Sequence, residues 1–237
     1  MPRIQMPRTL FLFDIDGTLV RRAGPHHRLA LVDAVRRVTG IDARIDHVPV
    51  QGMLDPVIIA TMLRDAGASA SLIRRAMPAI VDQAQNIYLR TCPRDLKAKT
   101  TPGARATLAR LRRKGIPTGL VTGNLSRIAW RKVESAGLHH YLSFGAFAEA
   151  APDRAGLARL AMNHARRRGW LQPDTRVWLV GDHESDIAAA RANSIGSIAV
   201  ATGLSSSSDL ANQRPDLLLD SLEAMPWDQV LGPMLSR

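Results

Sequence analysis

The sequence predicts an α/β fold, in which a mainly parallel sheet carries helices on both faces and a helical segment is inserted after the first strand. Three observations support this prediction. Short apolar runs typical of buried strands, such as Thr9–Phe13, alternate with amphipathic helical patterns after residue 98. Each strand that is followed by a helix implies a right-handed crossover and hence parallel pairing. From about 23 to 96, helical patterns dominate and no convincing strand is found.

The elements follow from local signals along the chain. In the inserted segment, apolar residues at helical spacing predict helices over 28–38, 56–66 and 71–90, and Asp55-Pro56 supplies an N-cap followed by proline at the first helical position. After it, glycines at 115 and 137 end two helices that begin near 101 and 126. Further helices are expected over 154–168 and 187–192, and Ser205–Ser208 is expected to be a loop. The strands expected after the first are 116–121, 175–180, 197–200 and 216–219.

The composition is that of an ordinary globular protein. The chain has 237 residues, of which 46% are hydrophobic and 22% charged, so it is too apolar for intrinsic disorder. The single cysteine, Cys92, excludes an internal disulfide framework and any multi-cysteine metal site. No apolar run approaches the roughly 18 residues of a membrane span. Because Asp14 and Asp16 interrupt the short apolar stretch near the N-terminus, it makes a poor secretory signal, and a cytoplasmic location is the default expectation.

The net charge of +11 raises the question of a nucleic-acid partner. Such binders carry their positive charge in clusters, whereas here the surplus is +5 up to residue 98 and +6 after it. The short basic clusters 112–114 and 166–168 come at the ends of expected helices, where cations favour the negative end of the helix dipole. We therefore expect no specific nucleic-acid partner and no membrane partner. A basic surface can still steer an anionic small molecule to a site.

Polar residues follow three of the expected strands. Asp14 and Asp16 come after the first, residues 122–124 (Thr-Gly-Asn) after the second, and Asp182 and Asp186 after the apolar run 175–180. Ligands of open parallel sheets bind beyond the carboxyl ends of the strands. Any one of these groups alone is explained by a helix cap or a turn. Caps and turns do not explain why three such groups occur together at the edge of the sheet where ligands bind.

These residue types suit phosphate chemistry with a metal ion. Asp14 and Asp182 are hard carboxylate ligands for Mg²⁺, which prefers one or two carboxylates, waters and a phosphate oxygen. Asp16 lies two residues after Asp14, so in an extended chain both side chains point the same way, and one can attack while the other handles a proton. Thr122 offers a hydroxyl, and the Gly123 region offers backbone N–H groups, to hold phosphoryl oxygens at a helix start.

The motifs FDIDGTLV, LVTGN and VGDHESD, in this order and separation, resemble those of the haloacid dehalogenase superfamily. The resemblance spans nearly the whole chain and is closest to phosphoglycolate-phosphatase-like members. It implies a Rossmann-like catalytic core made of residues 1–20 and 99–237. It also implies that residues 21–98 form a mobile helical cap domain that closes over the site, excludes water and supplies specificity residues.

The same resemblance implies a role for each site residue. Asp14 would be the nucleophile that takes the phosphoryl group as an aspartyl-phosphate. Asp16 would protonate the leaving alcohol and then activate water, and its backbone carbonyl would ligate Mg²⁺. Asp182 would also ligate Mg²⁺, with Asp186 assisting from beside it. The phosphate would be bound by Thr122, Gly123, Asn124 and Arg154.

One departure from the family pattern concerns its third motif, a basic residue that is usually a lysine followed by proline. The corresponding segment here is 150–154 (Ala-Ala-Pro-Asp-Arg), and no lysine follows residue 133. Arg154 is our candidate substitute, because arginine can hold a phosphoryl oxygen and a carboxylate together. The alternative is that Arg154 is an ordinary first-turn helix residue and that the activity is weak.

Other polar residues have simpler interpretations. The segment 51–55 resembles a cap loop that ends in Thr-Asp in many relatives, but Leu54 replaces the threonine, so we interpret Asp55 as a helix cap rather than a substrate contact. We interpret His183, next to Asp182, as a bystander at the mouth of the site. Cys92 has no base nearby in sequence and is interpreted as a structural thiol.

The sequence thus predicts a Mg²⁺-dependent phosphatase that hydrolyses a small phosphorylated metabolite, with a phosphoglycolate-like compound as the family-level expectation. The oligomeric state is left open between monomer and homodimer. Two alternatives are a phosphosugar mutase of the same superfamily and a non-catalytic phosphate-binding or regulatory relative. A dehalogenase reaction is disfavoured, because the related enzymes need no metal and lack the second carboxylate, which Asp16 retains.

Overall fold

Six parallel strands form a single sheet in the computed structural model, which describes residues 9–21 and 24–232. The strand order is β3-β2-β1-β4-β5-β6, and every neighbouring pair runs parallel. The predicted α/β class is therefore confirmed. The strands are β1 Thr9–Phe13, β2 Thr118–Val121, β3 Phe144–Ala146, β4 Arg176–Gly181, β5 Gly196–Val200 and β6 Leu217–Leu219.

The central strand explains where a ligand site can form. All five residues of β1 are buried, as the run Thr-Leu-Phe-Leu-Phe requires of a strand covered on both faces. After β1 the chain builds outward through β2 and β3, then returns to place β4 on the other side of β1 and continues to β6. The direction of winding therefore reverses between β1 and β4, and such switch points open a crevice at the carboxyl ends of the strands.

One strand was missed by the sequence prediction. β3 at the edge of the sheet has only three residues, Phe144, Gly145 and Ala146, and pairs with β2 on one side. It lacks the apolar run that marks a buried strand, because glycine stands at its centre. The segment that follows it leads directly into the helix that carries Arg154.

The helices agree with the expected ones at most positions. Two short helices near the C-terminus, α8 and α9, were not expected, and the loop expected at 205–208 is wrong in part because Ser207 begins α8. The Ser206 hydroxyl caps that helix by accepting from the backbone N–H of Asp209. The helices are α1 His26–Thr39, α2 Asp55–Asp65, α3 Ala70–Thr91, α4 Ala104–Arg113, α5 Ser126–Ser135, α6 Arg154–Arg167, α7 Glu184–Ala192, α8 Ser207–Asn212 and α9 Trp227–Leu231.

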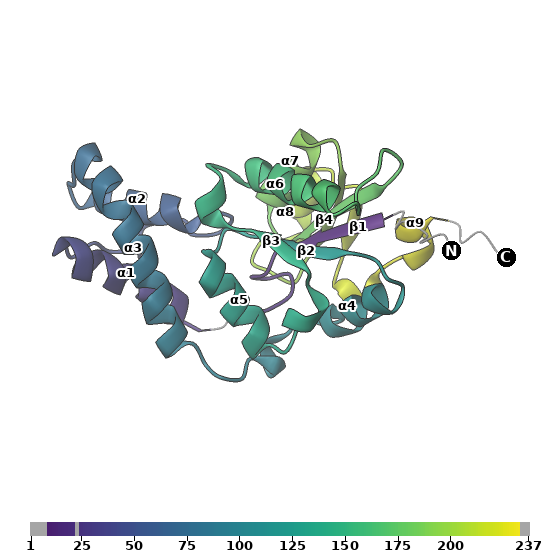
Figure 1. The fold of residues 1–237 in the computed structure, drawn as a ribbon, viewed down its shortest axis with the longest axis horizontal. Coiled ribbons are helices and arrows are strands. Elements are labelled where there is room, and N and C mark those ends of the chain that lie inside the picture. The colour runs from purple at the N-terminus through teal and green to yellow at the C-terminus, as the bar shows by residue number, and fades with distance from the viewer. Residues whose placement is uncertain (1–8, 22–23, 233–237) are drawn as a thin grey trace.

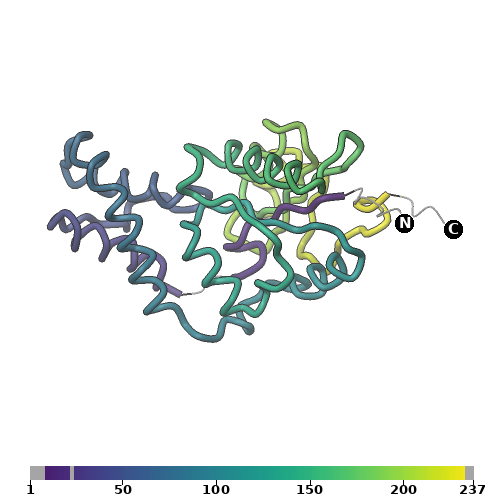
Figure 2. The backbone as a smooth tube through the Cα atoms, viewed as in Figure 1, coloured from purple at the N-terminus to yellow at the C-terminus, as the bar shows by residue number. Residues whose placement is uncertain are grey.

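The helices form two separate groups in space. Helices α6 and α7 lie on one side of the strands and α4 and α5 on the other, so the sheet is covered on both faces (Figure 1). Helices α1, α2 and α3 lie together at the far end of the long axis from both termini, as the backbone trace also shows (Figure 2). α1 packs against α3, and each helix contributes buried apolar residues to the core, Leu31 and Ala84 among them. We keep the boundaries at residues 20 and 98 as a proposal for where a cap joins the core.

The chain enters and leaves the helical group through two adjacent segments. Val20 forms an antiparallel bridge with Thr100, and the Arg21 N–H donates to the Lys99 carbonyl at 2.7 Å. Two neighbouring connections of this kind suit a hinge.

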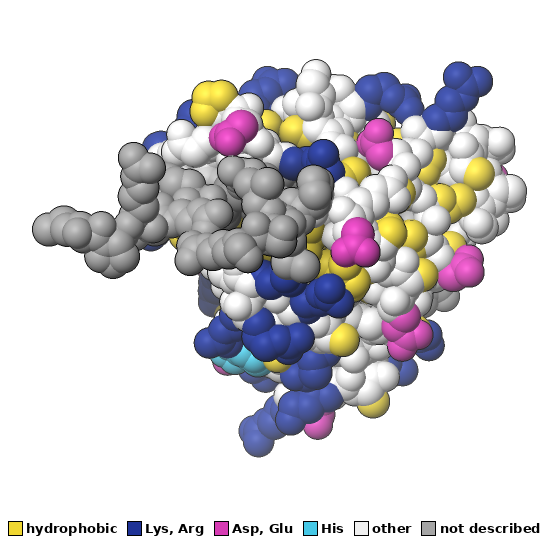
Figure 3. Space-filling view, turned by 90° about the vertical axis from the view of Figure 1, so that its right-hand side faces the viewer, with side chains coloured by type: hydrophobic (Ala, Val, Ile, Leu, Met, Phe, Trp, Pro, Cys, Tyr) yellow, Lys and Arg dark blue, Asp and Glu magenta, His cyan; other side chains and the backbone are white. Residues whose placement is uncertain are grey.

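The positive charge is visible at the end of the molecule away from α1–α3. On that face, Lys and Arg side chains gather in the lower part, and Asp and Glu side chains are scattered over the rest (Figure 3). Arg110 of α4 stacks on Trp227 of α9, with its guanidinium 4.5 Å from the ring centroid. Among the described helices, none has both the length and the apolar character that crossing a membrane would require.

Candidate functional site

Three carboxylates meet at the carboxyl ends of β1 and β4. Asp14 directly follows β1, and its N–H extends the ladder to the Val180 carbonyl at 2.9 Å. Asp182 directly follows β4, and Asp186 lies in the first turn of α7. All three are buried, and each offers an oxygen within 4.8 Å of the others. Asp14 and Asp182 therefore lie within reach of a single cation, as the sequence predicts.

Gly17 lets Asp182 approach the first loop. Its φ of +85° lies in the left-handed region, and a Cβ at this position would come within 2.2 Å of an Asp182 carboxylate oxygen. The next residue then uses that proximity, because the Thr18 hydroxyl donates to Asp182 Oδ1 at 3.0 Å. The loop after β1 thus positions a carboxylate that belongs to β4.

Arg154 points into the carboxylate cluster. It is the first residue of α6, whose N-cap Asp153 accepts from the Gly156 N–H at 2.7 Å. Its side chain is 6% exposed, and Nη1 lies 2.7 Å from Asp186 Oδ1 and 3.3 Å from Asp14 Oδ1. A first-turn residue that only faced solvent would be exposed and would not contact these two carboxylates. The structure therefore places Arg154 where the sequence analysis expected a basic group beside Asp14.

The carboxylates of this cluster are buried and repel one another, so their pKa values are raised. Burial and the neighbouring Asp14 and Asp186 raise the pKa of Asp182 to about 8. Burial likewise raises the pKa of Asp186 to about 7, and Asp14 adds to the rise, although Arg154 opposes it. One guanidinium therefore does not compensate three neighbouring carboxylates.

A divalent cation fits these residues. Asp14 Oδ1 is buried, and within the described part of the chain no group donates a hydrogen bond to it, because its contact with Arg154 is an ion pair without hydrogen-bond alignment. Hard oxygen donors held close together by the protein are the ligands that Mg²⁺ takes. The cluster of Asp14, Asp182 and Asp186 can thus bind a metal ion.

We expect Mg²⁺ to stabilise the protein more strongly at high pH. The raised pKa values mean that the metal-free folded state keeps protons that the unfolded chain releases above its ordinary carboxyl pKa of 3.8. The stability of the metal-free protein therefore falls as the pH rises toward 8. Mg²⁺ at this cluster would bind the deprotonated carboxylates and remove this repulsion. Thermal denaturation at pH 5.5 and pH 8.5 tests this, and an equal rise in Tm at both pH values would contradict it.

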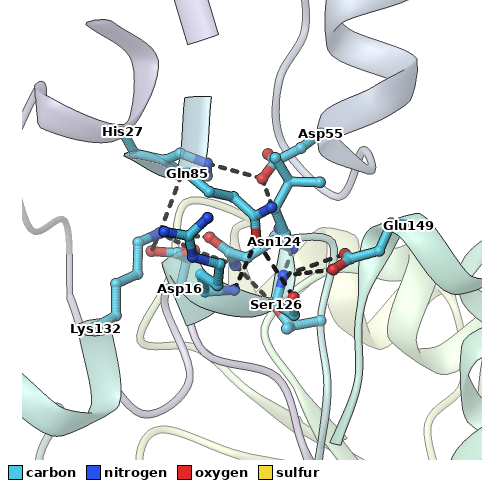
Figure 4. Close-up of polar contacts among 11 residues, drawn as sticks. Asp16, His27, Asp55, Gln85, Asn124, Ser126, Lys132 and Glu149 are labelled. Atoms are coloured by element: carbon cyan, nitrogen blue, oxygen red, sulfur yellow. Dashed lines mark hydrogen bonds and ion pairs between the residues drawn. The ribbon is translucent and has the colours of Figure 1, made fainter. Parts of the chain in front are cut away.

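Asp16 belongs to a second group of polar residues, which includes Asn124 and Lys132 (Figure 4). The Asn124 amide donates to Asp16 Oδ2 at 2.8 Å and to the Thr122 hydroxyl at 2.7 Å. Thr122 follows β2 and is fully buried. The side chains of Asp14 and Asp16 thus face different partners, although the two residues share one loop. A role for Thr122, Gly123 and Asn124 in phosphate binding stays a prediction.

Lys132 is a functional candidate that the sequence analysis missed. It lies in α5, is 1% exposed, and its Nζ contacts the two carboxylate oxygens of Asp16 at 2.7 and 2.6 Å. These contacts lower the pKa of Asp16 even though burial opposes the shift. The only signal in the sequence is a lysine on the otherwise apolar face of Ile128, Ala129 and Val133.

The interpretation of Asp55 as a helix cap is wrong. The N-cap of α2 is Leu54, and Asp55 is already helical. The Asp55 carboxylate is 2% exposed, and its Oδ2 accepts from the Leu125 N–H at 2.8 Å and contacts His27 Nε2 at 2.9 Å. A residue of the helical group therefore binds the loop after β2, because tertiary partners outweigh the local capping preference.

The loop before α2 packs tightly on the sheet domain. A Cβ at Gly123 would lie 2.3 Å from the Met53 carbonyl oxygen, and the Gly123 carbonyl accepts from the Asp55 N–H at 2.8 Å. The His183 ring lies directly against Gly52, and its side chain also accepts from the Ser185 N–H as the N-cap of α7. His183 thus contacts the helical group rather than standing alone at the mouth of the site.

Helix α3 contributes a further set of contacts. Gln85 Oε1 accepts from the Arg127 N–H at 2.9 Å at the start of α5, where Glu149 also accepts from the Ser126 N–H (Figure 4). The Arg127 guanidinium reaches back to Asp82 at 3.2 Å. These contacts therefore hold α3 against the start of α5.

Comparisons with known proteins agree with this geometry. Residues 11–191 match the family model described as haloacid dehalogenase-like hydrolase. A plasmid-encoded phosphoglycolate phosphatase of Cupriavidus necator is 31% identical over 235 residues, which cover 95% of each chain. The phosphoglycolate phosphatase of Chromobacterium violaceum is 28% identical and covers 89% of this chain and 91% of its own. Among solved structures, β-phosphoglucomutase from Clostridium difficile superposes with a TM-score of 0.72 at 18% identity over 95% and 96% of the two chains, which shows a shared fold.

Proposed function

Since the chain belongs to the haloacid dehalogenase-like hydrolase family, we propose that it is a Mg²⁺-dependent phosphatase acting on a small phosphomonoester. The observation that carries the proposal is the buried cluster of Asp14, Asp182 and Asp186 with Arg154 against it. A cluster this acidic repels a phosphate dianion unless a cation is present. When bound there by Asp14, Asp182 and Asp186, together with the Asp16 backbone carbonyl, Mg²⁺ supplies charge neutralisation for the phosphoryl group.

Asp14 supplies the nucleophile in this proposal. A carboxylate has two oxygens, so one oxygen of Asp14 can ligate the cation while the other attacks phosphorus. A new O–P bond forms to Asp14 as the bond from phosphorus to the leaving oxygen breaks. Arg154 holds Asp14 in place and is close enough to neutralise charge on the transferring group.

Asp16 handles the proton in both steps. In the first step it gives a proton to the leaving oxygen, which departs as an alcohol. In the second step the Asp16 carboxylate takes a proton from water, whose oxygen attacks the aspartyl-phosphate and releases inorganic phosphate and free Asp14. Its side chain is 42% exposed, so it can exchange that proton with solvent between steps.

We also propose that α1–α3 act as a cap. The two adjacent connections at Val20–Thr100 provide a hinge, and the contacts of Asp55, His183 and Gln85 hold the helical group closed. A closed cap excludes water from the aspartyl-phosphate until the alcohol has left. The substrate class follows from the relatives that are named phosphoglycolate phosphatase, so a small phosphorylated carboxylic acid is the first compound to test.

The experiment is a phosphate-release assay on a panel of phosphomonoesters with Mg²⁺. We expect release from 2-phosphoglycolate or a related small compound, and its loss in excess EDTA with recovery on adding Mg²⁺. Absence of release from the whole panel would contradict the proposal. A phosphosugar mutase would instead return isomerised sugar phosphate with little free phosphate, and product analysis by NMR separates the two.

A further inference from the structure

Lys132 differs from the other lysines of the chain in its surroundings. The chain has four lysines, and Lys97, Lys99 and Lys114 are exposed, whereas Lys132 is buried in α5. A buried ammonium is retained only where partners compensate its lost hydration. The partners of Lys132 therefore indicate its role.

The three protons of this ammonium face three acceptor side chains, which together offer four acceptor atoms. Nζ lies 2.7 and 2.6 Å from the two oxygens of Asp16, 2.7 Å from Asn124 Oδ1 and 3.1 Å from His27 Nδ1 (Figure 4). A lysine has three donors and no acceptor, so all of them are used. Lys132 therefore has no donor left for a substrate and acts on Asp16 instead.

The contact with His27 fixes the form of that histidine. Because Nδ1 faces an ammonium, it is the acceptor, and Nε2 carries the proton that it donates to Asp55 Oδ2 at 2.9 Å. His27 and Asp55 come from α1 and α2, whereas Asp16, Asn124 and Lys132 come from the sheet domain. One hydrogen-bonded chain thus runs from the helical group to Asp16.

We propose that Lys132 is a positioning residue for Asp16, and that seating α1 and α2 completes its hydrogen bonds through His27. The inference rests on the proposed function, in which Asp16 transfers the proton. Without Lys132, the Asn124 amide is the one donor to Asp16 among the described residues, and the half-exposed carboxylate can rotate away from the water whose proton it takes in the second step. When the cap opens, Lys132 loses its third acceptor, so Asp16 is held firmly only in the closed state.

The kinetic test is Lys132→Met in the phosphate-release assay. Loss of a group that orients a catalytic residue costs on the order of 10- to 100-fold in activity, and we expect this loss in kcat with a smaller change in KM. In an Asp16→Asn background, Lys132→Met should cost less than about twofold more, because groups that act as a unit are non-additive. Lys114→Met, at an exposed lysine after α4 and outside the hinge, is the matched control and should match the wild type.

His27→Ala tests the link to the helical group. It removes the third acceptor but leaves the contact between Lys132 and Asp16, so kcat should fall by less than in Lys132→Met. In the Lys132→Met background it should add little, since both changes act through Asp16. Equal losses of His27→Ala in both backgrounds would overturn the link, and wild-type kcat in Lys132→Met would overturn the positioning role.

A second measurement does not need activity. With ¹⁵N-lysine labelling, four Nζ signals are expected, and the Lys132 protons should exchange slowly with water while the other three exchange fast. That signal should shift or broaden in Asp16→Asn and in His27→Ala, with the other three unchanged. A fast-exchanging Lys132 signal would overturn the inference. If the wild type releases no phosphate, the proposed function fails, but this spectrum still decides whether Lys132 is held between Asp16 and His27. The spectrum also decides this if the Lys132→Met variant does not fold.

Discussion

Replacing Asp14 by asparagine should abolish phosphate release while leaving the protein folded. The amide is nearly isosteric but cannot form the aspartyl-phosphate, and removal of a catalytic nucleophile costs on the order of 10⁴-fold or more. Asp14 also raises the pKa of Asp182 and Asp186 by repulsion. Its neutralisation therefore relieves the metal-free cluster, and the Tm in EDTA at pH 8 should be at least that of the wild type.

The intermediate itself provides the more direct measurement. Wild-type protein that is acid-quenched during turnover of a ³²P-labelled substrate should carry label that hydroxylamine removes, as an acyl phosphate does, and Asp14→Asn should carry none. Asp174→Asn, an exposed aspartate before β4, is the matched control and should label as the wild type. Full activity or full labelling of Asp14→Asn would remove Asp14 from the mechanism.

The parts of the site that lie in strand-end loops could be predicted from sequence. Asp14, Thr122 and Asp182 each follow an apolar run that has to form a buried strand, and the carboxyl ends of parallel strands share one edge of the sheet. Their convergence therefore follows from the pattern of strands and helices alone. The short edge strand β3 escaped prediction because a Phe-Gly-Ala segment owes its conformation to pairing with β2.

The residues that could not be predicted are those whose partners lie far away along the chain. Lys132 meets Asp16 across 116 positions, and Asp55 meets the Leu125 N–H across 70. Locally, Lys132 is one more helical lysine and Asp55 an ordinary helix cap, and both local signals are weak. The same limit left two alternatives open for Arg154. The direction in which the first residue of α6 points depends on how that helix packs against α7, β2 and β3.

We expect the charge of Arg154 to stabilise the folded protein and the position of its guanidinium to support catalysis. Arg154→Met leaves the carboxylates of Asp14, Asp182 and Asp186 without a counter-charge, and breaking a buried ion pair costs about 3–5 kcal/mol. The metal-free variant should therefore unfold at a lower temperature than the wild type at pH 8. Because protonation of the carboxylates removes the repulsion, this difference should shrink at pH 5.5.

The comparison of Arg154→Met with Arg154→Lys separates the two contributions. Lysine keeps the charge and should restore the stability at pH 8, whereas methionine should not. In the phosphate-release assay, Arg154→Met should lose on the order of 10²- to 10³-fold, the scale set by removing one preorganised donor to the reacting oxygens. Arg154→Lys should retain more activity than Arg154→Met, because one nitrogen, Nη1, makes both contacts to Asp186 and Asp14 and an ammonium keeps a positive charge beside them. Arg159→Met, exposed on the same helix, is the control, and wild-type kinetics in Arg154→Met would show that the buried guanidinium serves the fold alone.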